Sequence, residues 1–598
     1  MSKQTINIGA SPNDGTGTPL RTSFDYTNQN FTELYTALGG GVGLPGATTQ
    51  VIFNDGGTNL AGDAGLVYNK TTDKLTVGTN IDIWNGLNGN STSTGVGATA
   101  LAATTAGATG NTALGYQAMY RATTGAANVA VGSSALSAAA MTGSSNVAVG
   151  ADAGRNVTTG SGNTFIGPAA GYSASAITGS NNTGIGQDTL RSLSSGADNN
   201  AIGRLAGNLI TSGNQNSLLG TAAGRNITTG LYNIGIGLEA IGNSATSTTG
   251  SDNIALGRSA MFSNTAITGA DNIGVGRDVY ARLASGATNI AVGLTSGYYI
   301  NTGANNVLIG NAAGYTVTSG ADNVAIGRNT MNSASFITGN NNVGIGNSNL
   351  IKLNAGADNI AIGRGNAAEL ISGVQNIYIG TLSGAACVSS SNNVAIGYGT
   401  LNKSTSGDLV AVGISALQEN TSGSNNTAVG RSALNAVSVN SNNTALGFNA
   451  ARVTTASRAT AVGSGALELS TGGDSNTAVG YKALGNAILT GGFNTGIGDS
   501  AGTSLTAGIN NTLIGYNAAA NLTIGNANIC IGMNATVNAV SDSNTLAIGS
   551  SGQFVATNGG ATTYYATATA GAIVPLSFVG YMRIRLNGTF VKVPIYND

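Results

Sequence analysis

A five-residue pattern, Asn-x-Ala-(Val/Ile/Leu)-Gly, recurs along this chain at nearly constant spacing and constrains its fold more than any other feature. Copies include Asn128-Val-Ala-Val-Gly132, Asn323-Val-Ala-Ile-Gly327 and Asn476-Thr-Ala-Val-Gly480. Counted by its Val/Ile/Leu-Gly ending, the repeat occurs 27 times between residues 93 and 549, at a mean spacing near 17.4 residues with steps of 16 to 20. Asn stands four residues before the Gly in 23 of these copies; the exceptions are Ser93, Leu409, Ala459 and Thr545. A fixed period of this length is typical of a solenoid, in which each repeat stacks on the next.

The repeat is too short for a helix with its connections, but it accommodates two strands of about five residues separated by Gly-rich turns. The sequence therefore predicts an all-β fold, a parallel β-solenoid or β-roll of about 27 coils of about 17 residues each. At about 4.8 Å per coil, such an array would be roughly 125 Å long.

The two faces of the repeated strand differ in bulk. Val, Ile or Leu precedes the Gly in every copy, whereas the alternate positions carry Asn, mostly Ala or Gly, and then Gly. We expect the bulky face to be removed from water by coil-on-coil stacking and the Asn side chains to form an amide ladder. We also expect the flat Ala/Gly face to let other chains approach closely. The alternative is that these small residues fit tight corners within one chain.

The repeat resembles that of the heads of trimeric autotransporter adhesins, which use an Asn-x-Ala-Ile-Gly-x-x-Ala type of motif over shorter repeats. The likeness covers residues 93–552. It implies a left-handed parallel β-roll formed by three associated chains. The sequence lacks the secretion signal and the membrane-anchor barrel of that family, which disfavours a bacterial surface adhesin.

Residues 1–40 are predicted to form an N-terminal attachment segment with one helix. Thr18 and Pro19 fit the start of the helix, and Gly39 fits its end. Leucine and phenylalanine residues at heptad spacing fit a trimeric seam or an amphipathic face against the rest of the segment. These candidate seam residues are Leu20, Phe24, Phe31, Leu34 and Leu38.

The same segment resembles the amino-terminal module of structural proteins from tailed bacteriophages, including trimeric baseplate proteins and many tail fibres. The likeness covers about 35 residues, among them Pro12-Asn-Asp-Gly-Thr-Gly-Thr-Pro-Leu-Arg21 and Asn28-Gln-Asn-Phe31-Thr-Glu-Leu-Tyr35. It implies attachment at the virion end of a fibre.

Two further segments flank the repeats. Residues 41–92 alternate like strands joined by turns and resemble a small β-module of phage fibre proteins, with Trp84 expected as a core or cap residue at the entrance of the array. Residues 553–598 carry Asn587-Gly588, which predicts a β-hairpin with a type I′ turn. We expect this hairpin either to cap the last coil or to form a receptor-binding tip.

Three near-copies around Ile177, Ile267 and Ile337 fall in 19-residue steps. Their two extra residues should bulge at one corner of the coil. Sequence duplication explains their similarity, and a lateral binding ridge is the functional alternative.

The composition excludes several kinds of chemistry. The chain has no histidine and a net charge of −1, so it offers no Ser/His pair, no His-ligated metal site and no basic footprint for nucleic acid. Cys387 and Cys530 lie about nine repeats apart, which predicts unpaired thiols. The start of the chain lacks the apolar core of a secretory signal, and no stretch resembles a membrane helix. We expect no cofactor and no metal; calcium at Asp55 and Asp63 is a weak alternative.

A few residue types remain as candidates for binding or catalysis. Paired carboxylates for polysaccharide cleavage could come from Asp188 with Asp198, or from Asp278 with its neighbours, although acids at turns are ordinarily only solvated. Tyr298, Tyr299 and Tyr315 could stack on sugars. Arginines that directly follow the repeat Gly would keep the stacked surface soluble or contact an anionic glycan; they are Arg204, Arg258, Arg277, Arg328, Arg364 and Arg431.

Together these features predict a non-enzymatic virion protein, a homotrimeric tail fibre that attaches a phage to the host cell surface. Its expected partners are other virion proteins at the N-terminus and an unknown host receptor, which could be a glycan. It would be made in the host cytoplasm. A head fibre, a polysaccharide-depolymerising tailspike and an ice-binding protein are the alternatives, the last disfavoured because no regular Thr-x-Thr face is present.

Overall fold

The computed structural model describes residues 92–549, except 103–104, 106 and 243–246, together with seven strands outside that range. The chain divides into two compact units, residues 1–285 and 286–598, and each is considered by itself. Every regular element among the described residues is a β-strand, which confirms the all-β prediction.

The first unit opens with an antiparallel meander and continues as a stack of parallel strands. In the meander, β1 pairs with β2, β2 with β3 and β3 with β4. Trp84 in β4 then pairs with Gly95 in β5, so this residue does lie at the entrance of the array. The strands are β1 (Thr48–Asn54), β2 (Leu60–Asn69), β3 (Lys74–Val77), β4 (Ile81–Asn85), β5 (Thr94–Val96), β6 (Thr112–Leu114), β7 (Val129–Val131), β8 (Val147–Val149), β9 (Thr164–Ile166), β10 (Thr183–Ile185), β11 (Asn200–Ile202), β12 (Ser217–Leu219), β13 (Ile234–Ile236), β14 (Ile254–Leu256) and β15 (Ile273–Val275).

The second unit is a longer stack of the same kind, followed by antiparallel strands. Its coil strands are β16 (Ile290–Val292), β17 (Val307–Ile309), β18 (Val324–Ile326), β19 (Val343–Asn347), β20 (Ile360–Arg364), β21 (Ile377–Thr381), β22 (Val394–Ile396), β23 (Val410–Val412), β24 (Thr427–Val429), β25 (Thr444–Leu446), β27 (Thr460–Val462), β29 (Thr477–Val479), β30 (Thr495–Ile497), β31 (Thr512–Ile514), β32 (Ile529–Ile531) and β33 (Thr545–Ile548). The remaining strands are β26 (Val453–Thr454), β28 (Leu469–Ser470), β34 (Phe554–Thr557), β35 (Ser577–Leu586) and β36 (Thr589–Asn597).

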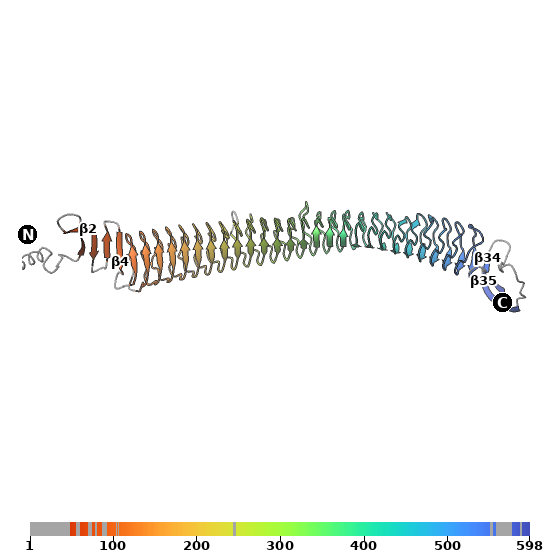
Figure 1. Ribbon diagram of the computed structural model, residues 1–598, viewed down its shortest axis with the longest axis horizontal. Helices are drawn as coiled ribbons and strands as arrows, with labels where there is room; N and C mark the ends of the chain where they lie inside the picture. The colour runs from red at the N-terminus through yellow and green to blue at the C-terminus, as the bar shows by residue number, and fades with distance from the viewer. Residues whose placement is uncertain are drawn as a thin grey trace, which may run out of the picture. The chain divides into compact units, whose positions relative to one another are not determined.

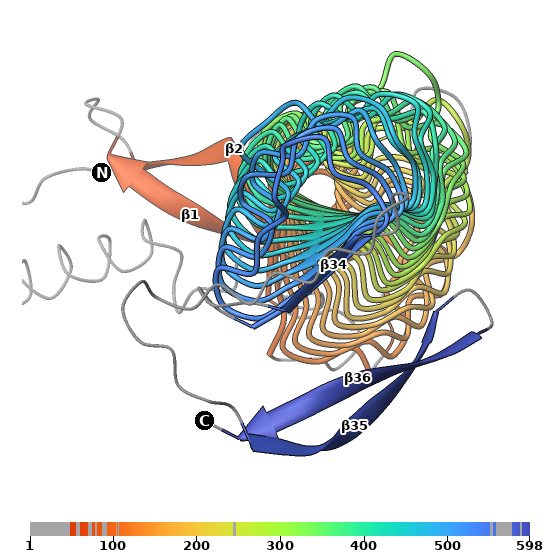
Figure 2. The ribbon, with the colours of Figure 1, turned by 90° about the vertical axis from the view of Figure 1, so that its right-hand side faces the viewer.

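Coil strands pair in parallel, with equivalent repeat positions opposite each other. In β7 and β8, for example, Val129 pairs with Val147 and Ala130 with Ala148. Figure 1 shows the strand arrows of each unit side by side and pointing the same way, and the end-on view of Figure 2 shows coil overlying coil. The predicted parallel β-solenoid is therefore confirmed in both units.

The expectation of two strands per coil is wrong. Each coil has one strand, usually of three residues, and the rest of the repeat is almost entirely turns. Among the described residues, two coils carry a second short strand, in the pair β26–β28, and isolated bridges such as Val157 with Ile177 join several others.

The turns are built on residues in the left-handed conformation. In the coil of Gly132, Ser134, Leu136 and Ser145 have φ values of 56°, 48° and 59°. Isolated chains disfavour this conformation for side chains with a Cβ. Here the turn backbone bonds to the next coil, as the Leu136 N–H does to the Ala153 carbonyl at 3.0 Å, and these bonds hold the turns in place.

The expected orientation of the strand faces is reversed. Ala130 in the middle of β7 is fully buried, whereas Val129 and Val131 on either side are only half-buried. The same pattern, with a buried middle residue, recurs through β5–β32 wherever a coil strand begins at this position. The small residues therefore face the interior of the coil, where the turn on the other side lies close, and the branched residues face outward.

The expected Asn ladder is present inside each unit. The Asn128 side-chain oxygen accepts from the Asn146 N–H at 2.8 Å and from Asn146 Nδ2 at 3.0 Å. Asn128 Nδ2 in turn donates to Asn111 Oδ1 and to the Gly143 carbonyl, both at 3.1 Å. Asn323 and Asn476 make equivalent bonds in the second unit, to Gly339 and Gly491. Where the Asn column is continuous, each amide joins its coil to both neighbouring coils.

The repeat Gly is required because the next coil lies against it. Gly132 has φ of 132°, and a Cβ at this position would overlap the Gly150 carbonyl. Gly327 and Gly480 have the same relationship to Gly346 and Gly498.

At the C-terminal end of the chain, β35 and β36 form the predicted antiparallel hairpin, with Leu586 paired to Thr589. The last coil strand, β33, pairs antiparallel with β34. The predicted N-terminal helix and the seam residues Leu20, Phe24, Phe31, Leu34 and Leu38 lie outside the described residues.

Candidate functional surfaces

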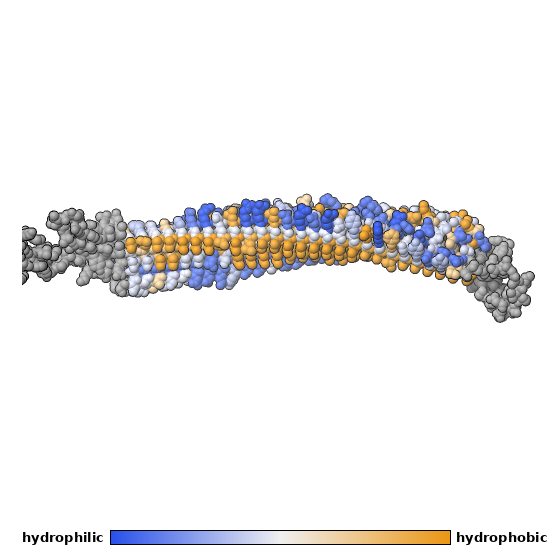
Figure 3. Space-filling view, in the orientation of Figure 1, coloured by the Kyte–Doolittle hydropathy of each residue, from blue (hydrophilic) through white to orange (hydrophobic). Residues whose placement is uncertain are grey.

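The outward strand residues form an apolar face in each unit. We define the apolar face as the residues one and three positions before the repeat Gly. The position directly before the Gly is Val, Ile or Leu in every coil, whereas the position three before it is Val, Ile or Leu in some coils and Thr, Ser or Asn in others. Figure 3 shows part of it as a regular row of hydrophobic side chains. The most exposed members in the row directly before the Gly are Leu114, Val149, Ile166, Ile202, Leu219 and Ile236 in the first unit, and Ile309, Ile396, Leu446, Ile497, Ile531 and Ile548 in the second.

A second row of exposed side chains directly follows the repeat Gly, where the chain bends. Its hydrophobic members include Tyr116 and Leu238 in the first unit, and Tyr398, Ile414, Phe448, Tyr481, Tyr516 and Met533 in the second. The six arginines singled out from the sequence occupy this row and are all exposed, so they border the apolar face. Arg277 lies 3.4 Å from the Asp278 carboxylate, and the Arg431 guanidinium lies 6.0 Å from the centre of the Phe448 ring.

The three 19-residue steps do bulge at one turn, as predicted. Each bulge carries a buried serine whose hydroxyl accepts a hydrogen bond from the N–H two residues later. These bonds join Ser175 to Ser173 at 3.1 Å, Thr265 to Ser263 at 3.2 Å and Ser335 to Ser333 at 3.1 Å. The serine closes a local turn, so the extra residues are held in one conformation.

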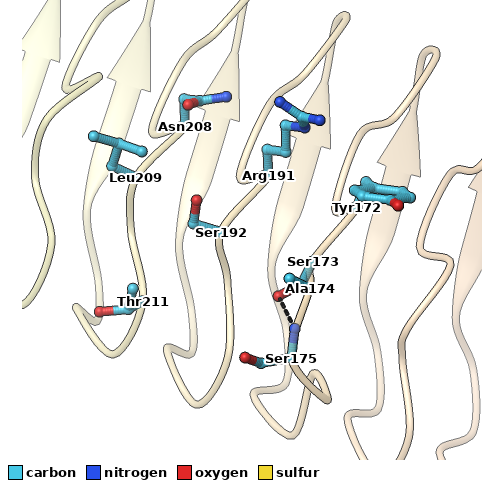
Figure 4. Close-up of a pocket in the computed structure, with 9 residues that line it drawn as sticks. All are labelled: Tyr172, Ser173, Ala174, Ser175, Arg191, Ser192, Asn208, Leu209 and Thr211. Atoms are coloured by element: carbon cyan, nitrogen blue, oxygen red, sulfur yellow. Dashed lines mark hydrogen bonds between the residues drawn. The ribbon is translucent and has the colours of Figure 1, made fainter.

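A pocket of about 380 Å³ lies beside the first bulge, in the first unit. Its lining comes from three consecutive coils, and Figure 4 shows Tyr172 and Arg191 at one side with Leu209 and Thr211 at the other. The guanidinium groups of Arg155 and Arg191 each lie 5.6 Å from the centre of the Tyr172 ring. The sequence analysis missed this pocket, although Arg155, Tyr172 and Arg191 all stand five residues after a repeat Gly.

The tyrosines proposed to stack on sugars do form a cluster, in the second unit. The rings of Tyr298 and Tyr315 are stacked at 5.1 Å with an angle of 22°, and Tyr299 contacts both at 4.9 and 5.3 Å. Phe336, on the bulge of its own coil, joins the cluster at 5.5 Å from Tyr299. The sequence analysis had not included Phe336.

The candidate acidic residues have local partners. Asp188 lies 3.4 Å from Arg191 Nε, and Asp198 accepts a hydrogen bond from Asn181 Nδ2 at 3.1 Å. Among the described side chains, no three of the kinds that bind metals come together in a group. Asp55 and the side chain of Asp63 lie outside what the structure describes.

Both cysteines are buried and unpaired, as predicted. Burial raises the pKa of the Cys530 thiol to about 11 and also raises the pKa of Cys387. Such thiols are poor nucleophiles at neutral pH.

Comparisons with known proteins identify no relative: no family model, no curated protein and no solved structure matches the chain. Within the part of the chain that the structure describes, we find no helical segment with the length and hydrophobicity needed to cross a membrane.

Proposed function

We propose that this protein is a non-enzymatic structural protein of a tailed bacteriophage virion, a homotrimeric tail fibre that attaches the particle to the host cell surface. The resemblance of residues 1–40 to phage attachment modules supports the location of the protein on the virion. The observation that carries the proposal is the apolar face, which recurs coil after coil in both units.

In the second unit, the apolar face is larger than the hydrophobic patch that a typical monomer leaves in water. A strip about 10 Å wide with a rise of about 4.8 Å per coil covers roughly 500 Å² over the eleven coil strands of the first unit and roughly 800 Å² over the sixteen of the second. The largest apolar patch of a typical monomer covers about 300–600 Å², and a stable interface buries about 800 Å² on each partner. Long fibres cover such a face by associating along their length.

Three copies fit this geometry because the hydrophobic surface turns a corner. The chain bends at the repeat Gly, and exposed side chains such as Tyr398 and Tyr481 continue the hydrophobic surface beyond it. This second side is mixed, since arginines such as Arg364 and Arg431 alternate with its hydrophobic members. A ridge with one apolar and one partly apolar side can contact two neighbours at once, as each chain does around a threefold axis. The sequence analysis had favoured the flat Ala/Gly face for this contact. Since that face is interior, the proposal now rests on the branched residues.

The assembly is tested by measuring the mass of the purified full-length chain by sedimentation velocity and light scattering. We expect three times 58.6 kDa and an extended shape. Replacing Ile309, Ile396 and Ile497 together by Asp should dissociate the trimer. The matched control replaces Ile371, Ile509 and Ile524 by Asp; these residues are at least as exposed but lie outside the strands. A monomeric wild type, or equal dissociation of both variants, would contradict the assignment.

The place of the protein is tested by immunogold electron microscopy of virions with antibodies against this chain. Gold label at the tail would support a tail fibre. Gold label on the capsid would contradict that assignment and indicate a head fibre. Release of reducing sugar from host polysaccharide would favour the third candidate, a depolymerising tailspike.

A further inference from the structure

The pocket beside Tyr172 combines a fixed cation, several neutral hydrogen-bonding groups and one exposed hydrophobic side chain. It lies where the 19-residue coil, with Ser173 and Ser175, adjoins two coils of 17 residues that supply Arg191, Ser192, Asn208, Leu209 and Thr211. A volume of about 380 Å³ falls at the small end of ligand sites, which span about 300–1,000 Å³.

Arg191 supplies the cation and is held on two sides. Its Nε lies 3.4 Å from Asp188 Oδ1, and its guanidinium packs over the Tyr172 ring at 5.6 Å. Among the described residues its two terminal nitrogens have no ion pair or hydrogen bond. A planar guanidinium with both terminal nitrogens available matches the two oxygens of a carboxylate.

The other lining groups are suited to a polyhydroxylated ring. Ser175 and Ser192 bring hydroxyl groups that both donate and accept, and Thr211 brings a hydroxyl that donates to the Thr228 carbonyl at 3.2 Å and can accept from a ligand. Asn208 is fixed by a hydrogen bond from Nδ2 to the Asp188 carbonyl at 2.9 Å, and Leu209, 37% exposed, offers an apolar contact. The ring of Tyr172 is covered by guanidinium groups, so a ligand meets Arg191 rather than an open aromatic face.

We propose that this pocket binds a carboxylate-bearing sugar residue of a host surface polysaccharide. The carboxylate bonds to Arg191, the sugar hydroxyls bond to the serine and threonine side chains, and the C–H side of the ring lies against Leu209. The inference rests on the proposed function, since it names the class of receptor. A trimer would present the pocket three times, so weak binding to each site would add up to firm attachment.

The chain contains a matched control for this site. Arg155, from the preceding coil, lies at the same 5.6 Å from the centre of the Tyr172 ring and pairs with Asp152, three residues earlier, at 3.1 Å. It shares the coil position and the structural contacts of Arg191, but it does not line the pocket. Removing either arginine should cost similar stability, whereas only the loss of Arg191 should affect binding.

The test is calorimetric titration of the full-length protein with oligosaccharides that carry uronic or sialic acid, with neutral oligosaccharides of equal length and with sugar phosphates. We expect the carboxylated sugars to bind at least tenfold more tightly than the other two classes. Arg191→Gln should weaken this binding at least tenfold, Arg191→Lys should restore only part of it, and Arg155→Gln should change it less than threefold. Equal binding of neutral or phosphorylated sugars, or equal losses for both glutamine variants, would overturn the assignment.

The proposed sugar site and the proposed fibre assignment can be rejected independently of each other. Binding of carboxylated sugars that depends on Arg191 in a chain that is monomeric, or absent from virions, would retain the site and reject the fibre. A trimer located on the phage tail without such binding would retain the fibre and reject the site.

Discussion

The ring of Phe165 fills the space in which Gly171 has no side chain: a Cβ on Gly171 would lie 2.5–2.6 Å from three carbons of the ring. Most coils pair a small residue in the strand with a larger one six positions later, as Ala130 does with Leu136, both fully buried. Where the strand residue is large, the later position is Gly in several coils, including Tyr378 with Gly384. The interior of a coil therefore has room for one large side chain from these two positions.

Exchanging the large and small side chains at positions 165 and 171 tests whether these two positions share one space. We expect Phe165→Ala to cost about 3–5 kcal/mol through the cavity it leaves, and Gly171→Leu to cost about 1–3 kcal/mol or more through overpacking. The double variant recreates the Ala130/Leu136 combination and should recover most of the loss. Denaturant unfolding of the four proteins gives the coupling energy. Additive effects would show that the two positions do not compete for space.

The asparagine ladder can be completed where it is interrupted. Ala459 occupies an Asn position in the second unit, so it offers no side-chain acceptor to the N–H of Asn476. We expect Ala459→Asn to stabilise the neighbouring coils by about 1 kcal/mol, measured by hydrogen exchange. Ala459→Leu is the control, because Leu409 shows that the column admits this side chain. If both variants stabilise the coils alike, packing rather than hydrogen bonding is responsible.

Gly397 and Gly399 lie in the same coil, and both have positive φ, but only at Gly397 would a side chain collide with the next coil. A Cβ on Gly397 would lie 2.6 Å from the Gly413 carbonyl oxygen, whereas a Cβ on Gly399 would have its nearest neighbour at 4.0 Å. We expect Gly397→Ala to cost about 2–4 kcal/mol and Gly399→Ala about 1 kcal/mol or less. Urea midpoints of the two variants compare them directly. Similar urea midpoints would contradict this expectation, because they would mean that the next coil can move away from a side chain at position 397 at little cost.

Stability should fall in alkaline solution because of Cys530. Its thiol keeps its proton in the folded chain up to a pKa of about 11, compared with an ordinary value of 9.0. The unfolded chain loses this proton first, so this stabilising contribution is complete below pH 9 and is lost as the pH rises through 11. The loss should approach about 3 kcal/mol, and Cys530→Ala should remove this part of the pH dependence. Thermal unfolding at several pH values measures it, and identical profiles for both proteins would exclude the thiol as the cause.

The sequence by itself determined the features that repeat along the chain. In-register stacking places each residue against its equivalent in the next coil, so the period at Gly132 predicted the parallel pairing and the asparagines predicted the ladder. The three longer steps predicted bulges for the same reason, because two extra residues have to leave the stack.

Only the tertiary structure decided which face is interior and which residues meet around the coil. Alternation shows that Ala130 and Val131 point in opposite directions, but not which of them is enclosed. That depends on the left-handed turns, which bring the opposite side of the coil so close that only small strand residues fit beside Leu136 and its equivalents. The pocket at Arg191 depends on the same turns, because they bring together side chains from three coils that the sequence separates by 17–19 residues.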